Sequence, residues 1–274
     1  MFSGKTIYNP VGKAGEYARW ACNLYLGCSN DCDYCYCKQG VLATVAGGKV
    51  AMLKKCFKDE TDAFEKFTSE LQKTAPQIRK EGGLFFSFTS DPCLPETIDL
   101  TMLCVNLAAG MDVPCQILTK CAWWLDDESV MGALRVIKDH VAIGFTLTGM
   151  DELERGSTVS SNAERVKAMK TLHDMGIKTF ASFEPVVDIA KAATVFSKTE
   201  GICDFYKFGL LSGKRDYDRN QLKQLIEFVN LICEENKTPV YWKKSFYGLY
   251  GERIQGGMCV DADYDIFKSS RRDY

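Results

Sequence analysis

The sequence predicts an α/β fold in which a parallel sheet closes into a partial to near-complete (β/α)6–7 TIM-like barrel. Short apolar runs alternate with stretches of helical periodicity along the whole chain, and this alternation is typical of parallel strands joined by helices. The length of 274 residues suits one barrel. Because no Pro/Ser-rich linker interrupts the chain, we expect a single domain over residues 1–274, with its core at about 18–250 and a short C-terminal extension.

The first half of the chain contains two predicted strands and two predicted helices. The first strand-length run is Trp20–Gly27, and a cysteine-rich turn follows it. Apolar residues at helical spacing predict a helix over Asp62–Arg79, with Pro76 loosening its end. A Gly-Gly start and a proline stop bound the next strand within residues 82–92. The helix predicted over Ile98–Gly110 ends on its own glycine.

The second half repeats this alternation. Strands are predicted at Val113–Thr119, Val141–Thr148, Ile177–Phe183, Phe205–Leu211 and Pro239–Trp242. Helices are predicted at about Asp126–Asp139, from an N-cap at Ser161 or Asn162 to Gly176, and at Asn220–Glu235. In a barrel the loops after the strands share one face, so we expect the functional residues to lie at the carboxyl ends of these strands.

Composition and charge exclude several classes of protein. The charges of 34 Lys and Arg and 36 Asp and Glu leave a net charge of −2, so no global basic field attracts nucleic acid or an anionic membrane. The N-terminus lacks the pattern of a secretory signal, and no apolar run reaches the length of a membrane span. The odd number of 13 cysteines argues against a disulfide framework. We therefore expect a cytoplasmic protein without membrane contact.

Three cysteines form the most informative cluster. Cys28, Cys32 and Cys35 are spaced C-x-x-x-C-x-x-C in a polar loop after the first strand. Soft thiolate ligands select zinc or an iron–sulfur cluster. A [4Fe–4S] cluster with three cysteine ligands leaves one iron open, whereas structural zinc needs a fourth ligand such as Cys22 or Cys37. We interpret five other cysteines as small buried apolar residues, namely Cys56, Cys104, Cys115, Cys203 and Cys233.

This loop, with Tyr34 before its last cysteine, resembles the signature of the radical S-adenosylmethionine (radical SAM) superfamily. The blocks LYLGCSNDCDYCYC, FSFTSDPCLPE and ILTK are similar to the spore photoproduct lyase-like branch, also labelled DNA-repair photolyase-like. The later blocks SFEPVVD, YKFGLLSG and TPVYWKKSFYG are similar to a less characterised radical SAM group from phages and bacteria. The resemblance extends from about Cys22 to Gly248.

The resemblance implies a cofactor set and a reaction. Cys28, Cys32 and Cys35 would ligate a [4Fe–4S] cluster, and S-adenosylmethionine (SAM) would chelate the open iron. An electron from an external flavodoxin- or ferredoxin-like donor would cleave SAM to a 5′-deoxyadenosyl radical, which abstracts hydrogen from the substrate. Ser90 and Lys120 match positions that contact SAM in this branch. The alternatives are a turn at Ser90 and a solvated lysine at position 120.

Further candidates lie at other strand ends. Tyr34, Asp91, Thr146 and Thr148 are candidate cofactor contacts, and Glu184 is the candidate catalytic residue, able to bind ribose hydroxyls, accept a proton or cap a turn. Two polar residues of a predicted helix and the two histidines need no ligand to explain them. Glu164 and Arg165 are explained by an exposed helix face, His173 by the core, and His140 lies at the wrong end of the barrel.

The substrate is predicted less directly. Spore photoproduct lyases carry a hydrogen-donating cysteine where this chain has Phe88, and Cys93 lies five residues later, so direct reversal of thymine photodimers is not expected. The first hypothesis is a nucleic acid or nucleotide, and the alternatives are a peptide or small metabolite, or a non-catalytic zinc- or cluster-binding module. Aromatic and basic residues alternate in YWKKSFYGLYGERIQGG, which predicts either base stacking or a packed aromatic cap. Arg271 and Arg272 are expected in a solvated terminus.

Overall fold

The computed structural model describes residues 1–214 and 216–268, so Arg271 and Arg272 lie outside the described residues. Within these residues, eight strands form one sheet in the order β1-β2-β5-β6-β7-β8-β9-β10. The strands are β1 (Ile7–Tyr8), β2 (Ala21–Cys22), β5 (Leu84–Phe86), β6 (Cys115–Thr119), β7 (Val141–Thr146), β8 (Lys178–Val186), β9 (Phe205–Leu210) and β10 (Val240–Trp242). All neighbours from β2 to β10 are parallel, and β1 is an antiparallel edge strand.

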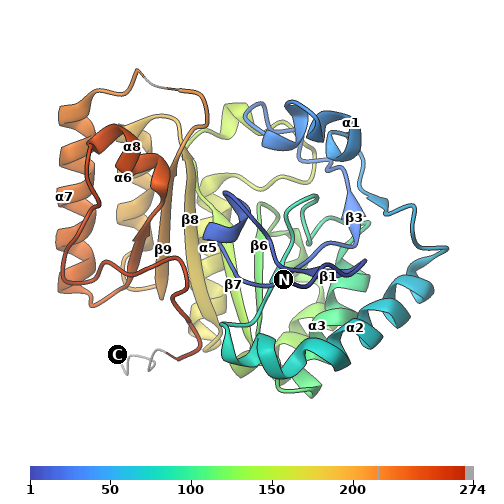
Figure 1. Ribbon diagram of the computed structural model, residues 1–274. Coiled ribbons are helices and arrows are strands. Elements are labelled where there is room, and N and C mark those ends of the chain that lie inside the picture. Colours follow the sequence, from blue (N-terminus) through green and yellow to red (C-terminus); the bar gives the residue numbers. More distant parts are fainter. Residues whose placement is uncertain (215, 269–274) are drawn as a thin grey trace.

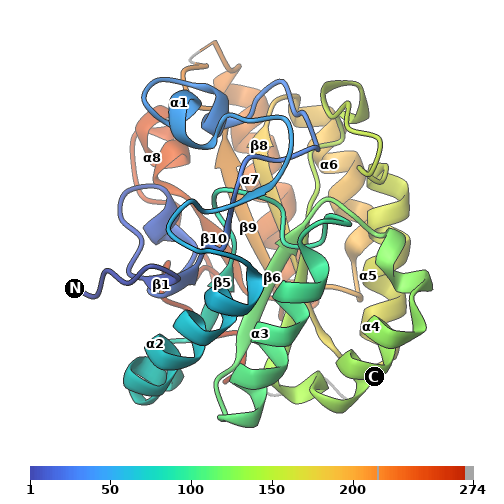
Figure 2. The ribbon, with the colours of Figure 1, turned by 90° about the vertical axis from the view of Figure 1, so that its right-hand side faces the viewer.

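Helices connect the parallel strands and cover the outer side of the sheet (Figures 1 and 2). They are α2 (Glu60–Lys80), α3 (Ile98–Gly110), α4 (Glu128–Val136), α5 (Asn162–Asp174), α6 (Ile189–Phe196) and α7 (Arg219–Glu235). Two shorter helices, α1 (Leu42–Ala46) and α8 (Lys244–Tyr250), follow the cysteine loop and β10. The terminal strands β1 and β10 are not paired with each other in the described part of the chain. The prediction of a partial βα barrel is therefore confirmed.

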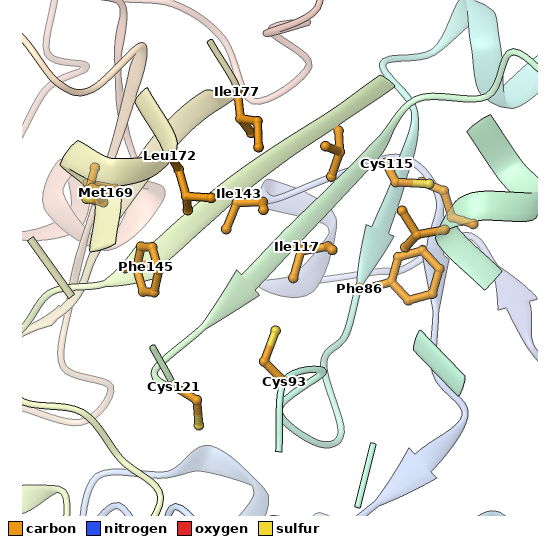
Figure 3. Close-up of a cluster of buried hydrophobic side chains, with 14 of the residues drawn as sticks. Phe86, Cys93, Cys115, Ile117, Cys121, Ile143, Phe145, Met169, Leu172 and Ile177 are labelled. Carbon is orange, nitrogen blue, oxygen red and sulfur yellow. The ribbon is translucent and has the colours of Figure 1, made fainter. Parts of the chain in front are cut away.

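Residues alternate between the two sides of each strand, and both sides are buried. Outward-facing side chains such as Ile117, Ile143 and Phe145 pack with Met169 and Leu172 of α5 in the main core (Figure 3). Inward-facing side chains form a second core inside the barrel, made of Ala18, Phe85, Ala142, Phe180, Phe205, Tyr241 and Ile266. Because side chains two residues apart share a face, polar residues further along β8, β9 and β10 lie above this inner core.

The N-terminal segment closes the open side of the barrel. The 3-10 turn Ala14–Glu16 is held to β10 and α8 because Glu16 Oε2 accepts hydrogen bonds from Tyr241 Oη at 3.0 Å and from the Lys244 backbone N–H at 2.9 Å. Tyr17 then packs its ring on Phe85 of β5, with the ring centroids 5.5 Å apart. This segment therefore spans the gap between the two ends of the parallel sheet.

Several predicted boundaries are wrong for identifiable reasons. The run Trp20–Gly27 is not one strand, because β2 joins the main sheet whereas β3 (Tyr25–Leu26) pairs with β4 (Met52–Leu53) in a separate ribbon. The helix predicted over Asp62–Arg79 extends slightly further in α2, which starts at Glu60 and ends at Lys80, with Pro76 inside it and buried residues of its last turns packed against the core. The strand predicted to end at Thr148 ends two residues earlier.

Two further differences concern a helix and a cysteine. The helix α6 has only eight residues and was not predicted, although Asp188 caps it by accepting a hydrogen bond from the Lys191 N–H at 2.9 Å. Cys56 is exposed rather than buried, whereas Cys104, Cys115, Cys203 and Cys233 are buried as expected. Among the described residues, no helix is both long and apolar enough to cross a membrane.

Candidate functional site

A cavity of about 580 Å³ opens at the carboxyl ends of the parallel strands. Its wall includes the cysteine loop, α1, residues that follow β5, β6, β9 and β10, and residues at the carboxyl ends of β7 and β8. Nine of the ten candidate residues line it: Cys28, Cys32, Tyr34, Cys35, Ser90, Asp91, Lys120, Thr146 and Glu184. The tenth, Thr148, is fully buried behind the wall, where its Oγ1 is 3.4 Å from Glu154 Oε1 and its backbone N–H donates to Asn162.

The cysteine loop is held in place by the backbone that follows it. The Cys28 N–H donates to the Gly48 carbonyl at 2.9 Å, and a Cβ atom at Gly27 would lie 2.3 Å from the Val50 carbonyl oxygen. This close approach requires a glycine at position 27. Burial raises the pKa of the Cys28 thiol to about 12, whereas a hydrogen bond from Cys37 lowers the pKa of Cys35 below its usual value.

The three cysteines do not form a single-ion site. Within the described residues, no group of three His, Cys, Asp or Glu side chains is arranged to hold one metal ion. A tetrahedral zinc site needs its ligands to converge on one point. An iron–sulfur cluster distributes its thiolate ligands over different iron atoms. The donor set of three thiols on one cavity wall fits the ligands of an iron–sulfur cluster.

A buried ion pair fastens the cysteine loop to the barrel. Arg165 of α5 and Glu154 form a salt bridge with both side chains fully buried, and Tyr34 donates a hydrogen bond to the same carboxylate. Arg165 also donates to the Lys120 carbonyl at 3.1 Å and to the Thr146 carbonyl at 2.8 Å. Burial, followed by the charge of Glu154, raises the pKa of Tyr34 well above its usual value. The interpretation of Arg165 as an exposed helix residue is therefore wrong.

Asp91 organises the loops rather than pointing a free carboxylate into the cavity. Its Oδ1 accepts hydrogen bonds from Thr119 Oγ1 at 2.6 Å and the Cys93 N–H at 2.9 Å. Its Oδ2 accepts from Asn30 Nδ2 at 2.8 Å and the Lys120 N–H at 2.9 Å. The carboxylate thus joins the ends of β5 and β6 to the cysteine loop.

Ser90 and Lys120 are two polar residues on this wall. Ser90 Oγ is buried and has no hydrogen-bond partner among the described residues. Lys120 Nζ lies 5.6 Å from the centroid of the Tyr34 ring. Burial lowers the pKa of Lys120, but Cys32, Glu154 and Asp91 outweigh this effect, so the pKa is raised overall. An unpaired hydroxyl and a cationic amine can bind the carboxylate and amine of an amino acid-like ligand.

Glu184 belongs to a second polar cluster on the wall made by β8 and β10. Its Oε2 accepts hydrogen bonds from Lys243 Nζ at 2.6 Å and from Tyr17 Oη at 2.5 Å. Tyr17 Oη is also 2.7 Å from Ser182 Oγ, and Lys243 Nζ lies 4.2 Å from the centroid of the Tyr17 ring. Burial, followed by the charge of Glu184, raises the pKa of Tyr17 well above its usual value.

Comparison with known proteins identifies the fold. No known protein-family model matches the sequence. An uncharacterized protein of Methanocaldococcus jannaschii is 25% identical over 218 residues, which are 77% of this chain and 76% of that protein. Spore photoproduct lyase complexed with dinucleoside spore photoproduct superposes with a TM-score of 0.60 at 16% identity, covering 87% of this chain and 79% of the lyase.

The chain has the fold of spore photoproduct lyase. A mutant of the lyase with the same dinucleoside superposes with a TM-score of 0.58 at 16% identity and covers 82% of this chain and 76% of the lyase chain. The resemblance to the spore photoproduct lyase-like branch is therefore confirmed at the level of the fold.

Within the lyase fold, Phe88 is part of the cavity wall. Its ring stacks on Phe85 with centroids 4.7 Å apart, and it lines the cavity together with Cys37. Cys93 is buried and does not line the cavity, whereas the Cys37 thiol lies 3.7 Å from the Phe88 carbonyl oxygen. Cys93 is the first cysteine after Phe88 in the sequence, but Cys37 is the one that reaches the cavity.

The C-terminal aromatic segment is a packed cap. Tyr241, Trp242 and Phe246 are buried, so their rings are not available to stack on bases. Neither histidine lines the cavity. His140 Nε2 lies 3.0 Å from Asp112 Oδ1 at the surface, as expected for the far end of the barrel, and His173 is only half-buried rather than a core residue.

Three residues of the site had no role in the sequence-based predictions, namely Tyr17, Glu154 and Lys207, and Lys243 was considered only within the C-terminal aromatic and basic segment. One signal was present, because polar residues alternate with aromatic ones in the strands, as in Phe205-x-Lys207 and Tyr241-x-Lys243. A charged residue at an inward position of a buried strand predicts either an ion pair or a ligand.

Proposed function

We propose that this protein is a radical SAM enzyme that binds a [4Fe–4S] cluster and SAM in the cavity and abstracts hydrogen from a substrate in the same cavity. The observation that carries the proposal is the shared wall: the C-x-x-x-C-x-x-C thiols, the unpartnered Ser90 hydroxyl and the Lys120 amine all line one cavity at the carboxyl ends of the strands. In a βα barrel this is the face where active sites are found.

Each group of residues has its own role in this proposal. Cys28, Cys32 and Cys35 hold the cluster, and Ser90 and Lys120 bind the amino-acid part of SAM. When bound, the reduced cluster would supply the electron that splits SAM into methionine and a 5′-deoxyadenosyl radical, and this radical would take a hydrogen atom from the substrate. The clamp formed by Tyr34, Glu154 and Arg165 keeps the cysteine loop in register with the strand ends. Other candidate contacts to the cofactor are Asp91, Thr146 and Thr148, of which only Thr148 lies outside the wall.

The substrate is proposed to be a nucleic acid or nucleotide, by analogy with spore photoproduct lyase and its dinucleoside. The same chemistry on a peptide or small metabolite is the alternative. Glu184 is the proposed catalytic residue because its Oε2 is held by Lys243 and Tyr17, while the side chain lines the cavity. The single electron comes from an external flavodoxin- or ferredoxin-like donor. A reducing, cytoplasmic location is consistent with 13 free thiols.

Anaerobic purification tests the cluster. We expect a brown protein with about four iron atoms per chain, and loss of this iron in the Cys28→Ala, Cys32→Ala and Cys35→Ala variants. Cys56→Ala is the matched control because Cys56 is an exposed cysteine outside the cavity wall, and it should retain the iron. Colourless protein with stoichiometric zinc would contradict the proposal.

Turnover is tested separately. Reduction of the iron-loaded protein in the presence of SAM should produce 5′-deoxyadenosine and methionine in equal amounts. If the brown protein forms neither product with a strong reductant, it binds a cluster but is not a radical SAM enzyme. Comparing modified nucleosides and peptides from cells with and without the gene then separates the two substrate classes.

A further inference from the structure

The wall formed by β8, β9 and β10 contains two buried lysines. Lys207 and Lys243 are each only 2% exposed. Lys243 Nζ donates to Glu184 Oε2 at 2.6 Å, and Lys207 Nζ donates to the Tyr17 carbonyl at 2.7 Å. The two ammonium groups lie 4.2 Å and 4.9 Å from the centroid of the Tyr17 ring, which is therefore a shared neighbour of both.

The charges in this cluster do not balance. Among the described residues, Glu184 is the one carboxylate that forms an ion pair with either lysine. Glu16 is also buried, but its Oε2 is engaged by Tyr241 Oη and the Lys244 N–H. An ammonium group buried without a counter-ion is energetically costly. Burial, followed by the charge of Lys243, accordingly lowers the pKa of Lys207 to about 7, with Glu184 offsetting part of the shift.

The cluster is accessible from the cavity. Lys243, Glu184 and Tyr17 line it, as do Lys13 and Ser212, whose side chains are 2.5 Å apart. Space for the carboxylate depends on Gly209, where a Cβ atom would lie 2.7 Å from Glu184 Cδ. A group entering the cavity can therefore reach Lys243, whereas Lys207 does not line the cavity and is linked to Lys243 through the Tyr17 ring that both ammonium groups approach.

We propose that this lysine wall, defined by Lys13, Lys207 and Lys243, binds an anionic group of the substrate, a phosphate or a carboxylate. The bound anion supplies the negative charge that the two buried lysines lack. The inference rests on the proposed function only in treating the cavity as the place where the substrate binds. Anion binding itself requires neither cluster nor turnover.

The test measures equilibrium binding to the full-length protein by calorimetry with two matched pairs of probes. The first pair is thymidine 5′-monophosphate and thymidine, and the second is acetyl-alanyl-alanine and its C-terminal amide. We expect the charged member of at least one pair to bind at least tenfold more tightly than its neutral partner. Preference within the first pair indicates a phosphate-bearing substrate, and preference within the second pair indicates a carboxylate.

Substitutions of opposite sign separate binding from folding. Lys243→Gln should weaken binding of the preferred charged probe by about tenfold or more. Glu184→Gln removes the competing carboxylate and should strengthen binding of that probe, which a damaged fold cannot do. Lys244→Gln is the matched control because Lys244 is the exposed neighbour of Lys243, and it should change affinity by less than about twofold.

Three outcomes would overturn the proposal. The first is equal affinity for the charged and neutral members of both pairs. The second is that Lys243→Gln and Lys244→Gln change the affinity for the preferred charged probe equally. The third is that Lys120→Gln weakens binding of this probe whereas Lys243→Gln does not. The last result would move the anion to the cysteine side of the cavity. Because none of these measurements uses the cluster, failure here leaves the radical SAM proposal standing, and absence of iron leaves the anion site standing.

Discussion

Replacing Arg165 by Met tests the idea that a buried ion pair holds the cysteine loop on the barrel. The substitution keeps the side-chain volume but removes the charge from a site where both Arg165 and Glu154 are fully buried. It leaves the Glu154 carboxylate without its counter-ion and the Thr146 carbonyl without the Arg165 donor, whereas the Lys120 carbonyl keeps its hydrogen bond from the Ser160 N–H at 3.0 Å. Breaking a buried pair in this way costs about 3–5 kcal/mol of unfolding free energy.

Urea denaturation measures this loss. With m values of about 1–3 kcal/mol/M, the midpoint of Arg165→Met should fall by more than about 1 M. The double variant Arg165→Met/Glu154→Gln removes both charges, and it should lose only about 2 kcal/mol because the Thr146 carbonyl still lacks its donor. Lys170→Met is the matched control on α5, since Lys170 pairs with Asp174 at the surface, and it should cost less than about 0.5 kcal/mol.

Two results would refute the reasoning about this pair. One is a loss below about 1 kcal/mol in Arg165→Met, which would mean that the charge is not buried in solution. The other is additivity, in which the double variant loses as much as the two single variants together. Coupling between Arg165 and Glu154 is the specific expectation, because residues of one network do not contribute independently.

Three other substitutions give expected outcomes. Gly144→Ala should destabilise the protein by about 1–3 kcal/mol, because its Cβ would lie 2.3 Å from the Phe180 ring inside the barrel. The control Gly132→Ala, in open space on α4, should be neutral or stabilising in the same melts, and equal effects would contradict the packing argument. Lys207 has a folded pKa of about 7, below that of an unfolded lysine, so the native state binds fewer protons above pH 7. The unfolding free energy of the wild-type protein should therefore rise between pH 7 and 10 by up to about 1.4 kcal/mol per pH unit relative to that of Lys207→Met. Parallel pH profiles of the two proteins would contradict a lowered pKa at Lys207. Ser161→Ala removes the N-cap of α5 and should cost about 1 kcal/mol in urea melts, whereas an unchanged midpoint would show that the cap is dispensable.

Predictions based on local pattern succeeded where the local interaction decides the structure. Ser161 caps α5 in a capping box with Glu164, as the sequence order of the two side chains suggests. The end of α2 was also predicted to within one residue, with Pro76 inside the helix. Local pattern failed for Arg165, because an arginine on a helix looks the same in sequence whether it faces solvent or a buried carboxylate.

The sequence by itself determined the alternation of strands and helices, the cysteine triplet and the positions of most candidate residues at strand ends. These features depend on neighbours within a few residues, or on the rule that parallel strands end on one face. Only the tertiary structure decided which polar residues meet. Glu184 pairs with Lys243, which is 59 residues away, and with Tyr17, which is 167 residues away. No local periodicity records such pairings, because they arise from the closure of the sheet and from the N-terminal segment that fills its open side.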